Sequence, residues 1–69
     1  MNLDFAQEFF VTYHQNEMSF DAFMQVLKHG IVLANMQQLE TNHLSNTDLN
    51  YLNIALSFNQ HVLLKELIS

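Results

Sequence analysis

Positively charged side chains are scarce in this chain. The 69 residues include two lysines and no arginine, against seven carboxylates, so the formal net charge is −5. A protein that binds nucleic acid directly neutralises phosphates with lysine and arginine. The sequence therefore predicts no direct binding to DNA or RNA. The seven carboxylates are spread along the chain without a run, which favours a solvated surface over an acidic mimic of DNA.

Cysteine, proline and tryptophan are absent, and glycine occurs once. Without cysteine, the chain can form neither a disulfide nor a thiolate zinc site. No apolar run approaches the roughly 18 residues of a membrane span, and Asp4 and Glu8 lie where a signal peptide would be basic and then apolar. We therefore expect a cytoplasmic protein that does not bind a membrane.

Apolar residues make up 49% of the chain, and they recur at helical spacing. This pattern predicts an all-α fold, a small bundle of three to four helices in a single domain over residues 1–69. The helices are expected at about residues 3–15, 19–29, 31–42 and 45–68. Ser19 is a good N-cap for the second of these. Five phenylalanines at helical spacing are expected in the core: Phe5, Phe9, Phe10, Phe20 and Phe23.

Gly30 separates the two middle segments. A lysine and a histidine followed by glycine are typical of a helix C-terminus. Beyond Gly30, Val32 and Met36 lie on the side that is polar one turn earlier. We expect a break or kink at Gly30. One continuous helix is the alternative, because no side-chain N-cap precedes Ile31.

The start of the last helix has the pattern of a capping box. The Ser45 hydroxyl is expected to accept from the amide of Asp48, and the Asp48 carboxylate to reach back. Leu44 and Leu49 flank this box in the positions of a hydrophobic staple. The helix that follows is expected to continue to about residue 68.

This last helix is apolar over about 220° of its circumference, more than packing against one pair of helices requires. We expect its leucines to form the internal core, namely Leu49, Leu52, Leu56 and Leu63. The remaining apolar side is expected to bind a partner, through Tyr51, Ile54, Phe58, Asn59 and Val62. Asn59 would either fix register at that helix interface or bind a backbone carbonyl of its own chain.

The histidines and carboxylates give little indication of metal or catalytic chemistry. Glu40 and His43 match the Glu-x-x-His spacing of di-iron bundles, and His14 with Glu17 is the reverse. A di-iron site needs two forward copies and further carboxylates. We interpret His29, like His43, as a helix-end residue near terminal carbonyls. The serines have no triad context, so we expect no metal, no cofactor and no enzymatic activity.

A short stretch at the start of the last helix is similar to part of a known family. The pattern Leu44-Ser45-x-x-Asp48-Leu49-x-x-Leu52-x-x-Ala55 resembles a segment of the Hha/YmoA family of small helical proteins, which partner the nucleoid protein H-NS. It covers about a sixth of the 69 residues. The family's basic residues are missing, and the stretch before the segment is longer than in the family. The resemblance implies a helical protein that binds another protein.

These observations predict a small non-catalytic protein that works by binding protein through an apolar helix face. A regulator, an inhibitor or immunity-type factor, and a co-chaperone all fit this description. The alternative is a homo-oligomeric structural or assembly subunit, in which the spare face of the last helix is the seam of a homodimer.

Overall fold

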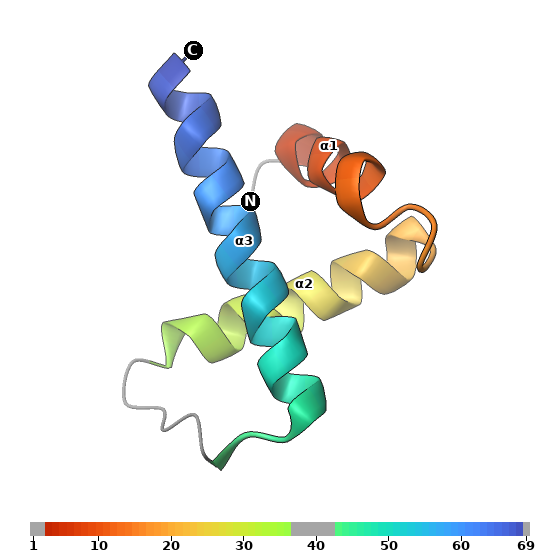
Figure 1. Ribbon diagram of the computed structural model, residues 1–69, viewed down its shortest axis with the longest axis vertical. Helices are drawn as coiled ribbons and strands as arrows, with labels where there is room; N and C mark the ends of the chain where they lie inside the picture. The colour runs from red at the N-terminus through yellow and green to blue at the C-terminus, as the bar shows by residue number, and fades with distance from the viewer. Residues whose placement is uncertain (1–2, 37–42, 69) are drawn as a thin grey trace.

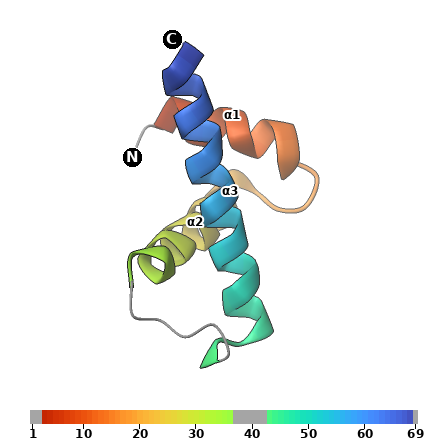
Figure 2. The same cartoon turned by 60° about the vertical axis from the view of Figure 1, so that its left-hand side comes forward.

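The computed structural model describes residues 3–36 and 43–68, and these form three helices. They are α1 (Leu3–Tyr13), α2 (Phe20–Asn35) and α3 (Asn46–Ile68). The prediction of an all-α protein is confirmed. Figure 1 shows α2 crossing the N-terminal half of α3, while α1 lies beside the C-terminal half, and Figure 2 shows the same order. No helix within the described ranges is long and apolar enough to cross a membrane.

The first two helices are joined by a tight turn. The helix α1 ends at Tyr13, two residues before the expected end, and the His14 amide still donates to the Phe10 carbonyl at 2.8 Å. A second bond of 2.9 Å, from the Glu17 amide to the His14 carbonyl, closes the turn. The Ser19 hydroxyl then accepts from the Ala22 amide at 3.1 Å, so Ser19 is the N-cap of α2, as predicted.

The break expected at Gly30 is wrong, while a kink there stays a prediction. The helix α2 continues through Gly30 to Asn35, and Gly30 has no positive φ of the kind that ends a helix. The segments expected at 19–29 and 31–42 are therefore one helix as far as Asn35, while residues 37–42 lie outside the described part of the chain. The residues of the shifted stripe, Val32 and Met36, are 60% and 52% exposed, whereas Ile31, which prolongs the earlier stripe, packs against the core.

At Gly30, α2 and α3 approach each other closely. It is buried, and a Cβ atom there would overlap the carbonyl oxygen of Tyr51 and lie 2.9 Å from the Cβ of Ala55. Ala55 is itself fully buried. The lone glycine therefore gives α3 access to the backbone of α2, which is a packing role and not a conformational one.

An aromatic cluster forms the core where the three helices meet. Phe9 of α1 has its ring centroid 6.1 Å from that of Phe23 in α2 and 5.6 Å from that of Phe58 in α3. Phe10 contacts Phe23 at 5.3 Å. The buried set is Ala6, Phe9, Phe10, Phe23, Leu27, Ala55 and Phe58, and Phe5 and Phe20 pack against it. The core positions expected for Phe9, Phe10 and Phe23 are confirmed, whereas Phe5 and Phe20 are partly buried at the margin of the core.

The N-terminus of α3 is capped in a different way from the one expected. The Ser45 hydroxyl accepts from the Asp48 amide at 3.0 Å, which confirms half of the capping box. The Asp48 carboxylate turns to α2, where its Oδ1 lies 3.2 Å from Nε2 of His29. His29 is thus inside α2 and contacts a side chain of α3, whereas the sequence placed it at a helix end.

Candidate binding surface on the last helix

One side of α3 is packed into the core. Phe58 is only 3% exposed and Ala55 is fully buried, while Ile54 and Val62 pack against the same cluster. The side that the sequence analysis assigned to a partner is therefore the packed side. A partner-binding role is contradicted for Phe58, which is in the core. Ile54, Val62 and Tyr51 are half-buried, and the ring of Tyr51 contacts that of His29 with a centroid distance of 5.3 Å, so their part in partner binding stays a prediction. Asn59 alone of this group is exposed.

The contact between Gly30 and Ala55 explains which side of α3 is buried. Because only glycine and alanine allow the two backbones to come so close, Ala55 must face α2. Residues 51, 58 and 62 lie on the same side of a helix as residue 55, at spacings of three, four or seven. Once Ala55 is fixed, Phe58 points to the aromatic cluster, and the leucines turn outward.

The opposite side of α3 is an exposed leucine face. We define the leucine face as Leu52, Leu56, Leu63 and Leu67, which share one side of a helix. Leu56 is 51% exposed, Leu63 is 62% and Leu67 is 80%, whereas Leu52 is partly buried. Leu56 and Leu63, which were expected in the core, are therefore on the surface. Leu64 and Ile68, also exposed, extend the apolar surface at one edge.

The leucine face carries amides at its middle and has no charge over most of its length. Asn59 and Gln60 are exposed and lie between Leu56 and Leu63. Residues 49–64 contain no aspartate, glutamate, lysine or arginine. A surface of this kind gains free energy from burial against another apolar surface, and it offers nothing to a charged ligand.

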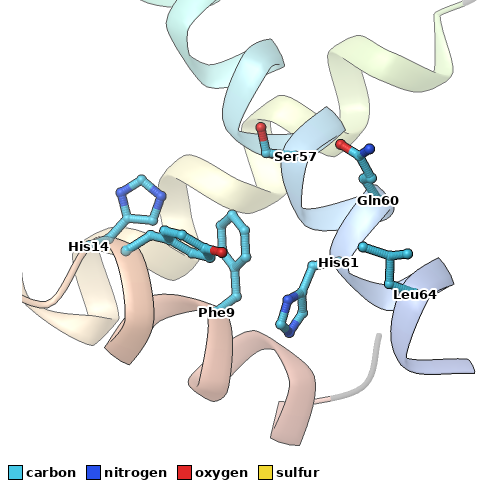
Figure 3. Close-up of a pocket in the computed structure, with 7 residues that line it drawn as sticks. Phe9, His14, Ser57, Gln60, His61 and Leu64 are labelled. Atoms are coloured by element: carbon cyan, nitrogen blue, oxygen red, sulfur yellow. The ribbon is translucent and has the colours of Figure 1, made fainter. Parts of the chain in front are cut away.

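A second feature is an open pocket between α1 and α3, with a volume of about 530 Å³. Figure 3 shows Phe9 and His14 on one side, facing Ser57, Gln60, His61 and Leu64 of α3. Tyr13 completes the lining. The walls combine two aromatic rings with hydroxyl, amide and imidazole groups. The pocket is large enough for a small ligand, but it opens to solvent beside the leucine face.

Of the two histidines that line this pocket, one pairs with a carboxylate and the other forms no hydrogen bond through its Nε2 in the described structure. His14 Nδ1 lies 3.4 Å from Glu17 Oε2, so the pair identified at this spacing in the sequence does come together. His61 Nε2 is buried without a hydrogen-bond partner in the described structure, and its nearest acid oxygen, Glu8 Oε1, is 3.9 Å away. The same Glu8 oxygen forms an ion pair with Lys65, which links α1 to α3.

The described residues contain no group of three or more histidines and carboxylates placed to hold a metal ion. Of the Glu-x-x-His pair considered from the sequence, Glu40 lies outside the described residues, and His43 is exposed before α3. The other pair, His14 and Glu17, meets on the turn between α1 and α2.

Comparison of this chain with protein-family profiles, with curated proteins and with solved structures finds no match in any of the three. The local similarity to the Hha/YmoA family is therefore not accompanied by a family match. Within that similar stretch, Ser45 caps α3 and Ala55 faces α2, which are roles in this chain's own fold.

Proposed function

We propose that this protein acts without catalysis, by binding another protein through the leucine face of α3. The observation that carries the proposal is the exposure of Leu56, Leu63 and Leu67, from 51% to 80%, on one side of one helix. Soluble monomers seldom expose contiguous apolar surface of this kind unless it binds something. Regulator, inhibitor or immunity-type factor and co-chaperone remain the roles that fit such a surface.

The leucine face favours a partner surface that is apolar and presented by a rigid element. Fully burying a leucine contributes about 1.5–3 kcal/mol, so three leucines half to four-fifths exposed contribute on the order of 4 kcal/mol before the cost of association. Asn59 and Gln60 add hydrogen-bonding groups at the centre, where a partner's polar group would be recognised. This arrangement is typical of helix packing at an interface.

Capture of binding proteins by immobilised protein tests the proposal. Leu56→Asp and Leu63→Asp each place a charge on the leucine face without opening the core, because both side chains are more than half exposed. We expect each variant to lose at least about 90% of a captured partner, in line with loss of a central apolar contact. Circular dichroism is expected to show unchanged helical content.

Asn50→Asp is the matched control. Asn50 is exposed on a different side of α3, and a carboxylate near the N-terminus of a helix is compatible with the helix dipole. It adds the same charge to the same helix, so it is expected to keep the partner. Capture that survives both leucine substitutions, or that Asn50→Asp abolishes equally, would contradict a binding role for the leucine face.

A further inference from the structure

The leucines of the leucine face are placed symmetrically about one point along α3. Leu56 and Leu63 lie three and a half residues on either side of the midpoint between Asn59 and Gln60, and Leu52 and Leu67 lie seven and a half residues on either side. At 1.5 Å per residue, these leucines are about 5 Å and about 11 Å from the midpoint along the helix axis. The amides themselves occupy the centre.

A surface with this symmetry matches an antiparallel copy of itself. A two-fold axis through the midpoint places Leu56 against Leu63 of the second copy, Leu52 against Leu67, and Asn59 against Gln60. Each amide has a donor and an acceptor, so the central amides can satisfy each other when the leucines exclude water. We therefore propose that the partner of the leucine face is a second copy of this chain, packed antiparallel along α3.

This inference rests on the proposed function and names its partner. Charge supports the antiparallel direction. Each copy carries a net charge of −5, but residues 49–64 have no charged side chain other than a titratable histidine on the packed side. An antiparallel pair places Glu66 across from Asn53 of the second copy, whereas a parallel pair places the two Glu66 side chains across from each other.

The interface of a stable dimer would take a modest share of the surface of this chain. A stable interface buries about 800 Å² per partner, which is about a sixth of the 4999 Å² surface of this chain. The leucine face extends for about 22 Å between Leu52 and Leu67. Leu64 and Ile68 widen it with exposed apolar surface along one edge. Because the leucine face is a narrow strip along one helix, we expect a small interface and a dimer that dissociates on dilution.

The first experiment measures mass in solution, by sedimentation equilibrium over a concentration series from about 10 μM to about 1 mM, because a small interface of this class is expected to be weak. The unaltered chain is expected to move from monomer to dimer as its concentration rises. Leu63→Asp is expected to stay monomeric throughout, and Asn50→Asp to dimerise like the unaltered chain. A monomer at the highest concentration would overturn the proposed second copy.

The second experiment reports the direction of packing. Because the sequence has no cysteine, each introduced cysteine is the only thiol of its variant. Leu56→Cys and Leu63→Cys are prepared separately, mixed and oxidised. Antiparallel packing predicts a mixed disulfide between the two variants, in several-fold excess over each variant's disulfide with itself. Self-disulfides in excess would indicate parallel packing and overturn the proposal. Asn50→Cys, which is off the leucine face, is expected to form neither.

These results separate the inference from the proposed function. A monomeric chain that still captures another protein, and loses it with Leu56→Asp, overturns the homodimer and leaves the binding role of the leucine face in place. A chain that neither dimerises nor captures protein through the leucine face contradicts both. Dimerisation that Leu63→Asp leaves intact would show that a different surface joins the copies, which overturns the inference as well.

Discussion

The two sides of α3 differ in burial although both are apolar. The packed side has Ile54, Phe58 and Val62 in or against the core, whereas the leucine face has Leu56 and Leu63 more than half exposed. Leucine is about as hydrophobic as isoleucine, valine and phenylalanine, so hydrophobicity does not explain the difference in burial. The contrast shows that the position of α3 follows from shape, since a glycine and an alanine allow a close approach on one side only.

The contacts that α3 makes in the core are also of two kinds, one between small residues and one between aromatic rings. At the crossing of α2 and α3, contact is made by Gly30 and Ala55, so backbone meets backbone. One turn further along α3, Phe58 contacts Phe9 across a ring distance of 5.6 Å. Small residues thus set how α3 is rotated, and large rings fill the space that the crossing leaves beside it.

The largest expected effect comes from truncating the packed side. Phe58→Ala removes a ring that is 3% exposed and in contact with Phe9, so we expect unfolding in urea to show a loss of about 3–5 kcal/mol. Leu63→Ala on the leucine face is the control, and its effect on a monomer is expected within about 0.5 kcal/mol. Equal losses for the two variants would contradict the contrast between the two sides.

The next largest effect is expected at the crossing. Gly30→Ala adds a methyl group where the Tyr51 carbonyl already lies, so α2 and α3 must separate. Overpacking of this kind costs about 1–3 kcal/mol, even though alanine is the better helix former. Ala22→Gly, at an exposed position of the same helix, controls for propensity and is expected to cost about 1 kcal/mol. A thermal melt in which Gly30→Ala is more stable than the unaltered chain would contradict the close approach.

The smallest effect is expected at the start of α3. Ser45→Ala removes the acceptor of the Asp48 amide and is expected to lower the free energy of unfolding by about 1 kcal/mol. Ser57→Ala, within α3, removes a hydroxyl from the pocket wall and is expected to be nearly neutral or slightly stabilising. Chemical denaturation of both variants gives the comparison. A neutral Ser45→Ala would show that the cap contributes nothing to the stability of α3.

Local pattern was enough to predict much of the fold. Helical spacing predicted an all-α chain, and the side chains of Ser19 and Ser45 predicted where α2 and α3 begin, because each cap is a bond between residues three apart. Phe9, Phe10 and Phe23 were placed in the core correctly, since α1 and α2 each have one clear apolar side. For α3 the same reasoning failed. Its apolar residues occupy most of the circumference, so periodicity does not distinguish Phe58 from Leu56.

What the sequence alone determined is the helical class, the helix starts and the excess of apolar surface on α3, because these depend on neighbours within a few residues. The tertiary structure decided that α2 continues through Gly30, that Asp48 binds His29 and that the leucines of α3 face outward. Each of these depends on contacts between residues far apart in the chain. A glycine that ends a helix and a glycine that lets a neighbouring helix pack closely look the same in sequence. Only the position of the neighbouring helix, here α3, distinguishes them.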